Sequence, residues 1–148
     1  MTDPVPFATT LHVRDTCLCL HAQRAARVLA RRFDALLRPV GLTNAQFSLL
    51  MALNRPVPAT LQPLAALLGA DRTTLTAALK PLQRRGLIET RPDPQDRRGR
   101  HILLTPAGRA LLAQAMPIWT EGQAVLEAEL VDPAGLRGGL VEIAALAT

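Results

Sequence analysis

Residues 64–106 read LAALLGADRTTLTAALKPLQRRGLIETRPDPQDRRGRHILLTP, and three patterns follow one another along them. Two short segments with helical apolar spacing come first, and the turn between them contains Gly69, which predicts a helix-turn-helix. Two strand-like runs, 86–91 and 100–104, come next and enclose the polar segment PDPQDRRG, which predicts a β-hairpin with a long basic tip. A helix-turn-helix followed directly by such a hairpin is a winged helix.

The second helix of this pair carries clear local signals. Asp71 is placed to cap its N-terminus, because a short acidic side chain accepts hydrogen bonds from the unpaired N–H groups there. Pro81 lies inside the helix, where it removes the bond to the carbonyl of Ala77 and should bend the helix. Apolar spacing buries one side of the helix and leaves the other facing outward. The outward residues are Thr73, Thr76, Ala77, Lys80 and Arg84.

A long amphipathic helix is predicted upstream over residues 16–38, ended by Pro39 and Gly41. Its apolar positions form two stripes, so its buried face should be wide, as in a helix that packs against its own domain and against a second surface, for which a dimer partner is one candidate. The second stripe contains Cys19, Ala26, Ala30 and Leu37. Thr43 and Gln46 match a capping box, which predicts the start of the next helix.

Downstream of the hairpin, Thr105 followed by Pro106 predicts the start of a long helix. Asp132 and Pro133 repeat the signal for a last helix that should end near Ala147. The predicted fold is therefore mainly α with a small β-hairpin wing. It combines a winged helix-turn-helix with further helices from both ends of the chain.

The charge of the chain is basic and unevenly distributed. Seventeen basic and 12 acidic residues leave a net charge of +5, and Lys80 is the only basic residue that is not Arg. Residues 71–100 hold eight basic and four acidic groups, whereas residues 101–148 hold two and five. This excess predicts an anionic partner for the helix-turn-helix and hairpin. With four aromatic residues and no Tyr, a surface that stacks unpaired bases is nearly excluded, so a nucleic-acid partner should be duplex.

Length and composition restrict the remaining classes. The 148 residues correspond to about one domain, and 49% hydrophobic residues are enough to form a core. No apolar run approaches the length that spans a bilayer, and residues 1–10 lack the pattern of a signal peptide. We therefore expect a cytoplasmic protein without a membrane partner. No cofactor and no metal is predicted.

Duplex recognition accounts for the residue types on the second helix. Its N-terminus directs unpaired N–H groups and a positive dipole at phosphate, and short polar side chains can reach base edges in the major groove. The predicted contacts are Arg72, Thr73, Thr74, Thr76 and Lys80.

The hairpin tip suits the narrow and electronegative minor groove, which attracts guanidinium groups. Its predicted contacts are Arg97, Arg98 and Arg100, and Asp96 is expected to orient the Arg98 guanidinium through a charge-assisted pair. A charge run such as DRRGR is by itself typical of a solvated loop. The order of helix, turn, helix, strand, basic tip and strand is what predicts DNA binding.

The same residues resemble the MarR family of winged-helix transcriptional regulators. The resemblance covers about residues 15–130 and rests on three segments, 41–50, 64–91 and 93–112. It implies a homodimer that binds a pseudo-palindromic operator, usually as a repressor released by a small ligand or an oxidant. Ala77 departs from the pattern, because many relatives have Arg there.

Carried across the chain, the resemblance implies one MarR-like unit over residues 1–148. Residues 10–40 and 106–148 would supply the dimerisation helices, and residues 43–104 the winged helix-turn-helix. Asp96 and Arg98 occupy the positions of the family's wing pair. The outward threonines and Lys80 occupy its recognition-helix face.

A small aromatic or phenolic ligand, often a carboxylate, is the first candidate for the releasing signal. The resemblance places such a ligand between the dimerisation helices and the winged helix. The predicted wall contains Cys19, Gln23, Phe47 and Met51, with Arg or His at the rim to meet a carboxylate.

Oxidation of Cys19 is the alternative signal. Cys19 and the segment RPVGLTNAQF resemble the organic-hydroperoxide-sensing branch of the family, in which a cysteine near the start of the first helix is reactive. That branch uses tyrosines to bond the thiolate, whereas Gln23 and Phe33 stand at the corresponding places here. A thiol in an apolar stripe without a donor is poorly reactive, so the favoured interpretation of Cys19 is a small core residue.

Cys17 and His21 offer a further possibility, because they share a helix face at i and i+4 with His12 nearby. Such a pair can bind a transition metal or activate a thiol, and solvated side chains are the plainer interpretation. A disulfide with Cys19 is not expected, because helical spacing would point the two thiols about 200° apart. A cysteine enzyme with His21 as base is a remote alternative, since no oxyanion-hole motif or phosphate loop accompanies it.

Overall fold

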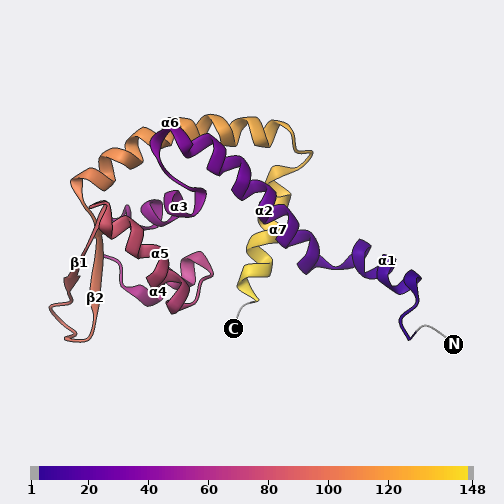
Figure 1. Cartoon of the computed structure of the whole chain (residues 1–148), viewed down its shortest axis with the longest axis horizontal. Helices are drawn as coiled ribbons and strands as arrows, with labels where there is room; N and C mark the ends of the chain where they lie inside the picture. The colour runs from indigo at the N-terminus through magenta and orange to yellow at the C-terminus, as the bar shows by residue number, and fades with distance from the viewer. Residues whose placement is uncertain (1–3, 147–148) are drawn as a thin grey trace.

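The computed structural model describes residues 4–146 and is mainly helical, with one antiparallel hairpin (Figure 1). Its elements are α1 (Phe7–Thr16), α2 (Leu18–Leu37), a 3-10 turn (Arg38–Val40), α3 (Asn44–Leu53), α4 (Leu61–Leu68), α5 (Arg72–Arg84), β1 (Ile88–Pro92), β2 (Arg100–Leu104), α6 (Pro106–Ala128) and α7 (Pro133–Ala145). The order of α4, α5, β1 and β2 confirms the predicted winged helix. None of the described helices is long and apolar enough to cross a membrane.

Four predicted helix starts are confirmed by their cap hydrogen bonds. Thr43 Oγ1 accepts from Gln46 N at 3.1 Å, and Gln46 Oε1 accepts from Thr43 N at 3.1 Å, so the capping box is complete. Asp71 Oδ1 accepts from a backbone N–H in the first turn of α5 at 2.7 Å. Thr105 and Asp132 cap α6 and α7 in the same way. These caps depend only on near neighbours in the chain, which is why the sequence predicts them.

The start of the predicted 16–38 helix is wrong. Residues 7–16 already form a separate helix, α1, and the chain leaves the helical conformation at Cys17, whose φ of −71° and ψ of 106° are extended. Cys17 Sγ accepts from Leu20 N at 3.4 Å and so caps α2. The other end agrees with the prediction, because α2 ends at Leu37 and the following turn closes at Gly41 in the left-handed conformation.

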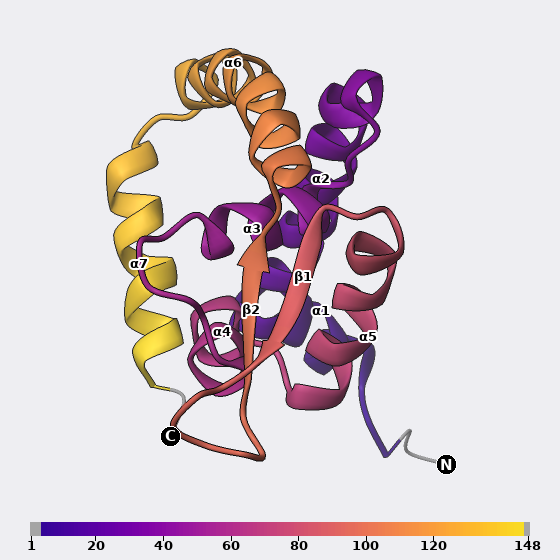
Figure 2. The same cartoon turned by 90° about the vertical axis from the view of Figure 1, so that its left-hand side faces the viewer.

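The hairpin pairs Ile88 with Leu104 at its base and Pro92 with Arg100 near its tip. β2 also pairs with the loop before α4, since Ile102 N donates to Ala59 O at 2.8 Å. Residues Ile88, Ile102 and Leu104 are buried, so the base of the hairpin belongs to the core. Only the far end projects from the molecule, beside α4 and α5 (Figure 2).

One hydrophobic core joins the helices around the hairpin. Its largest fully buried side chains come from α2, α3, α4 and α5, and they are Leu37, Leu50, Leu64, Leu75 and Leu82. Phe47 of α3 stacks on Trp119 of α6 with a centroid distance of 6.0 Å. α6 closely approaches the segment between α5 and β1, because a Cβ at Gly108 would lie 2.0 Å from Leu87 O.

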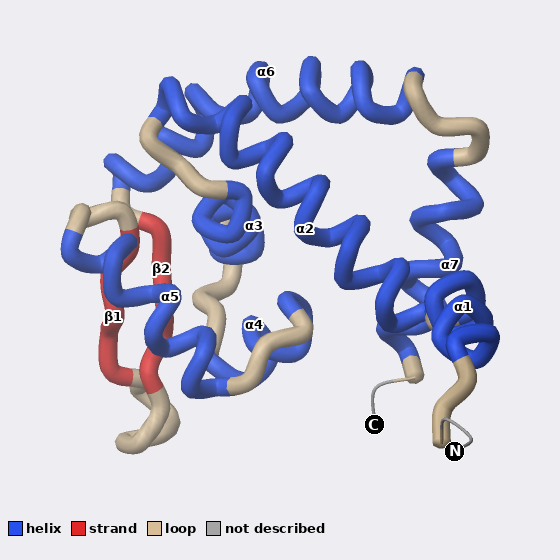
Figure 3. The backbone as a smooth tube through the Cα atoms, turned by 45° about the vertical axis from the view of Figure 1, so that its right-hand side comes forward, coloured by secondary structure: helices blue, strands red, loops and turns tan. Residues whose placement is uncertain are grey.

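α1 and α7 lie outside this core (Figure 3). Neither helix contains a buried residue among those described, and the first half of α2 is largely exposed as well. Their large exposed apolar side chains are Phe7, Val13, Leu18, Leu20, Val28, Leu136, Leu140, Val141, Ile143 and Leu146. The predicted burial of Cys19 is therefore wrong for the single chain, because no described part of the chain covers that part of α2.

Candidate nucleic-acid interface

α5 presents the predicted recognition residues on its exposed side. Leu75, Leu79 and Leu82 face the core. The exposed residues are Arg72, Thr73, Thr74, Thr76 and Lys80, as predicted. The helix continues through Pro81 to Arg84. α5 thus offers a polar surface that begins at its N-terminus.

The hydroxyl groups of α5 have different hydrogen-bonding roles. Thr74 Oγ1 donates to Asp71 Oδ2 at 2.8 Å, so it is part of the cap. Thr76 Oγ1 donates to Arg72 O at 2.7 Å, which leaves its oxygen lone pairs available as acceptors. Hydrogen bonds from the Thr74 backbone and hydroxyl lower the pKa of Asp71, so the cap is an anion at neutral pH.

The wing tip presents Arg97, Arg98 and Arg100 to solvent. Asp96 Oδ1 accepts from the backbone N of Arg98 at 2.9 Å, and Asp96 O accepts from Gly99 N at 2.9 Å. The predicted pair between the Asp96 carboxylate and the Arg98 guanidinium is not among the ion pairs of residues 4–146. That prediction is wrong, because the carboxylate accepts from the backbone of Arg98 and so shapes the turn.

Two residues at the base of the tip were not predicted. His101 Nε2 lies 3.4 Å from Asp93 Oδ2, and Asp93 Oδ1 accepts from Gln95 N at 2.8 Å. The only sequence signal for them is the repeated Asp on either side of Pro94 and Gln95. Figures 1 and 2 show the hairpin tip and the α4–α5 turn at the same end of the molecule, so the wing tip and the N-terminus of α5 lie at one end.

This arrangement of elements is similar to that of known proteins. The model of the MarR family matches residues 42–99. In structure the chain is similar to the M. tuberculosis transcriptional regulator MosR in complex with DNA, with a TM-score of 0.82, 39% identity, and coverage of 88% of this chain and 96% of that one. The chain belongs to the MarR family.

Further relatives are transcriptional regulators, not enzymes. The chain is 34% identical over 104 residues to the transcriptional repressor MprA of Escherichia coli, covering 69% of this chain and 57% of the repressor. It thus spans a little over half the length of the first curated relatives. A mutant E. coli MarR complexed with operator DNA has a TM-score of 0.77 at 25% identity, over 89% of this chain and 96% of that one.

The predicted effector residues do not form one site in this MarR-family chain, because they lie in two separate parts of the fold. Phe47 and Met51 line a pocket of about 480 Å³ between α3, α4 and α6, together with Ser48, Leu67, Leu68, Ala52, Met116 and Trp119. Cys19 and Gln23 lie on the first half of α2 and do not line it. No Arg or His is among the described residues that line this pocket, whereas His21, Arg24 and Arg32 line the larger groove between α2, α6 and α7.

Cys19 is exposed and has a hydrogen-bond donor, contrary to both parts of the prediction. Gln23 Nε2 donates to Cys19 Sγ at 3.1 Å, and Arg27 Nη2 donates to Gln23 Oε1 at 3.3 Å. The one-turn spacing of Cys19 and Gln23 on α2 could have indicated this contact. The sulfur therefore lies in a polar environment near the start of a helix.

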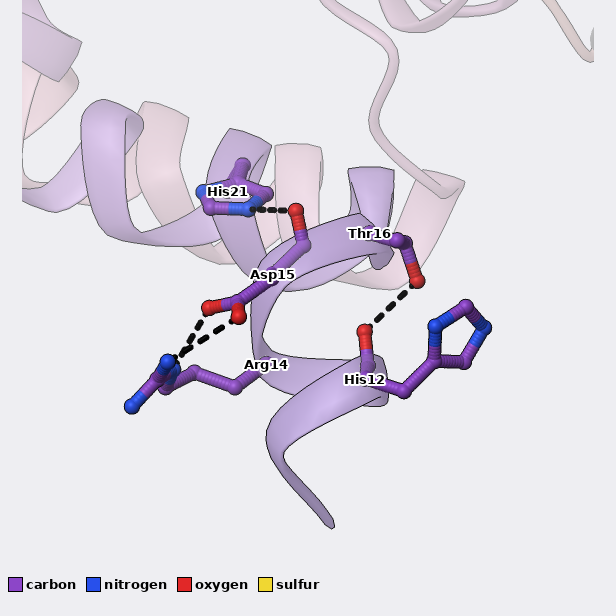
Figure 4. Close-up of polar contacts among 5 residues, drawn as sticks. All are labelled: His12, Arg14, Asp15, Thr16 and His21. Atoms are coloured by element: carbon purple, nitrogen blue, oxygen red, sulfur yellow. Dashed lines mark hydrogen bonds and ion pairs between the residues drawn. The ribbon is translucent and has the colours of Figure 1, made fainter. Parts of the chain in front are cut away.

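Cys17 and His21 do not share a helix face, because Cys17 is the extended cap of α2, so the possible metal-binding pair does not form. His21 Nε2 contacts Asp15 O at 3.3 Å, and the His12 ring points away from His21 (Figure 4). The Arg14 guanidinium beside Asp15 holds the pKa of that carboxyl below its usual range. Among residues 4–146, no group of three His, Cys, Asp or Glu side chains could hold a metal ion.

A larger apolar groove of about 740 Å³ lies between α2, α6 and α7. Its walls include Val28, Leu130, Leu136 and Leu140. An ion pair of Arg32 with Glu129, at 2.7 Å, joins α2 to the end of α6 beside the groove and raises the pKa of the arginine. The groove adjoins the exposed helices and shares no lining residue with α4, α5 or the hairpin.

Proposed function

We propose that this chain is a homodimeric, sequence-specific double-stranded-DNA-binding regulator of transcription that acts as a repressor in the cytoplasm. The observation that carries the proposal is that the start of α5, with its exposed polar residues, and the basic wing tip lie at the same end of the molecule. Relatives solved with DNA, including MosR and MarR, support it.

In this proposal α5 enters the major groove, and the wing enters the adjacent minor groove. Arg72 and Lys80 neutralise phosphate, whereas Thr73 and Thr76 lie where they can reach base edges. Thr76 acts as an acceptor, because its own hydrogen is donated to Arg72 O. Arg97, Arg98 and Arg100 supply the guanidinium groups of the wing.

Selection from a random pool of duplexes tests sequence-specific binding. We expect the enriched sequences to contain a pseudo-palindrome whose half-sites lie about one helical turn, roughly 34–36 Å, apart. The Thr76→Val variant removes the acceptor at nearly constant shape and should change the enriched bases in each half-site. A pool that retains no common motif after repeated rounds would contradict the proposal.

Homodimerisation is proposed from the exposed apolar surface of α1, α7 and the first half of α2. Burial of this much apolar surface is favourable, and a contiguous exposed patch of this kind typically marks an interface. A second copy is the proposed occupant of the 740 Å³ groove. Residues 10–40 and 106–148 would thus form the dimerisation region, and residues 43–104 the DNA-binding domain.

A small aromatic or phenolic molecule is the proposed effector, bound in the 480 Å³ pocket. The pocket wall offers Phe47, Trp119 and two methionines for contact with a flat ring, and Ser48 for a phenolic hydroxyl. Because the wall is uncharged, a neutral phenol should bind better than an aromatic carboxylate. The pocket lies between α6 and the helix-turn-helix, so a ligand there can shift the spacing of two recognition helices.

Release from DNA by matched phenols and aromatic carboxylates tests the effector. We expect the neutral phenols to release the duplex at lower concentration, and Met51→Trp to abolish release while DNA binding persists. Val57→Trp adds the same side chain at an exposed site outside the pocket and serves as the control. Release that is unaffected by Met51→Trp would exclude this pocket.

Thiol sensing is a second candidate function, favoured by the hydrogen bond that Gln23 donates to Cys19 Sγ. A Cys19 thiolate would attack the outer oxygen of an organic hydroperoxide, break the O–O bond, form a sulfenic acid and release the alcohol. Cys19→Ser should then abolish release by hydroperoxide, whereas the control Cys17→Ser should not. Equal release in wild type and Cys19→Ser would exclude this function.

A further inference from the structure

The base of the wing tip contains an acid and a histidine that are more covered than their neighbours. The side chains of Asp93 and His101 are 17% and 25% exposed, whereas residues 94–98 are all exposed. His101 Nε2 lies 3.4 Å from Asp93 Oδ2. This contact joins the first residue after β1 to the second residue of β2, so it spans the point where the tip leaves the sheet.

Asp93 also organises the tip itself. Its Oδ1 accepts from Gln95 N at 2.8 Å, and its backbone N donates to Gly99 O at 3.1 Å. A Cβ at Gly99 would lie 3.1 Å from Asp93 Cβ and 3.2 Å from Asp93 Oδ2, so the carboxylate is packed against the turn. Its position therefore determines where the segment with Arg97 and Arg98 lies.

Few other charges surround His101. On β1, Arg91 is its direct partner in the sheet register and pairs with Glu89. α3 and α4, which pack against β2, carry no titratable residue, and the first turn of α6 contributes Arg109. Arg100 precedes His101 and donates to Gly99 O at 3.2 Å. Asp93 is thus the anion in direct contact with the imidazole ring.

We propose that Asp93 and His101 are positioning residues of the wing, and that their contact makes DNA binding depend on pH. A protonated imidazole attracts the Asp93 carboxylate and holds the tip against the sheet with its arginines projecting. Loss of that proton removes the charge attraction and lets the tip move. The inference rests on the proposed DNA binding and adds a pH dependence to the same surface.

The sign follows from the charge on the imidazole ring, because histidine is the side chain that gains its charge toward acidic pH. When the ring is charged the wing is held, so the affinity for duplex is higher at acidic pH. At basic pH the affinity falls. Because the pair is partly exposed, we expect a change of about two- to fivefold between pH 5.5 and pH 8.0.

Fluorescence anisotropy at pH 5.5, 6.5, 7.5 and 8.0, with a duplex enriched from the random pool, tests the proposal in the full chain. His101→Gln and Asp93→Asn should bind duplex with little dependence on pH, and with the weaker affinity that wild type has at pH 8.0. His101→Lys keeps a cation at every pH, so it should remain at the tighter level throughout. His12→Gln, on α1, is the matched control and should retain the wild-type dependence.

NMR of the DNA-free protein provides an independent measure. The amide signals of Gln95 and Gly99 should shift together with the His101 ring as the ring titrates, and Asp93→Asn should uncouple them. Two results would overturn this inference while leaving the proposed function intact. One is the same pH dependence of binding in wild type and His101→Gln, and the other is Gln95 and Gly99 amide signals that do not shift with the His101 ring. Failure of the wild-type chain to bind duplex at any pH would overturn the proposed function as well.

Discussion

Arg98 is an exposed charge whose proposed contact is electrostatic. Arg98→Glu should weaken binding to every duplex sequence, because the wing contacts backbone and groove without reading individual bases. The salt dependence should become shallower by about one unit of slope for each phosphate that the variant no longer neutralises. Titrations at several salt concentrations, on enriched and scrambled duplexes, measure both effects.

Arg31→Glu is the matched control for that variant. Arg31 is also exposed, lies on α2 and changes the net charge by the same amount. If both variants weaken binding equally, the effect belongs to the total charge of the protein and the wing has no special role.

Gly108 is required by close packing between α6 and the segment that follows α5. An added Cβ would lie 2.0 Å from Leu87 O, a backbone atom that cannot rotate away. Gly108→Ala should therefore reduce the free energy of unfolding by about 1–3 kcal/mol or more, as overpacking typically does. Urea unfolding measures the change.

Gly138→Ala is the control, because its Cβ meets nothing within 4 Å and lies inside α7. Alanine is a better helix former than glycine, so this variant should be neutral or stabilising. An unfolding midpoint of Gly108→Ala equal to wild type would contradict the close approach.

Residues differ in how well sequence predicts them. Asp71 and Thr43 were predictable, since a cap uses atoms within three residues of it in the chain. The role of Asp96 was not predictable. Its carboxylate accepts from the backbone N–H of Arg98 and not from the Arg98 guanidinium, and the two-residue spacing allows either contact. The exposure of Cys19 depends on which other segments pack against α2. The residue pattern of α2 itself does not give that information.

Helix boundaries were predicted best where a side chain caps the start of the helix or a left-handed glycine follows its end. The break between α1 and α2 was missed, because a cysteine cap is an uncommon signal for the start of a helix. The helix over residues 7–16 has no buried residue and little apolar pattern of its own. It therefore gives little periodicity from which to predict it.

The cap of α5 predicts a specific response to acid. The pKa of Asp71 is lowered by hydrogen bonds from Thr74, so the folded state has the lower pKa. Its contribution to stability is present above the pKa of the unfolded chain and is lost as pH falls through the lowered folded value. Thermal unfolding of wild type and Asp71→Asn between pH 2.5 and pH 6 measures this contribution.

Asparagine is a good cap without a charge, so it keeps the acceptor and removes the titration. Wild type should be more stable than Asp71→Asn at pH 6, and this advantage should disappear at pH 2.5. A difference in melting temperature that is constant over the range would contradict the charged cap.

For the whole molecule, the order of the predicted elements was enough to predict the fold class. It was not enough to predict the two pockets. Both pockets are formed by helices that are distant in the chain, and one is bounded by α7, whose position depends on packing. Phe47 and Met51 were placed at a pocket by the resemblance. Trp119 and Met116 were not, because they lie within a long helix whose orientation the sequence does not specify.

The exposed surface of α7 predicts the oligomeric state. Val141 is 64% exposed in the single chain, and we expect a partner to cover it. Val141→Glu would place a charge in an apolar interface, so the dimer should dissociate at concentrations at least about tenfold higher than wild type. Size-exclusion chromatography with light scattering, over a dilution series, measures this.

Val57→Glu is a closely matched control, because Val57 is 65% exposed and lies in the loop before α4. It should leave the dimer intact. Loss of dimer in both variants, or in neither, would contradict the proposed interface.

A stoichiometric titration of an enriched duplex against a scrambled duplex, at physiological salt, tests the central claim most directly. The account predicts two chains bound per enriched duplex and an affinity at least about 1,000-fold higher than for the scrambled one. Equal affinity for the two duplexes would contradict it.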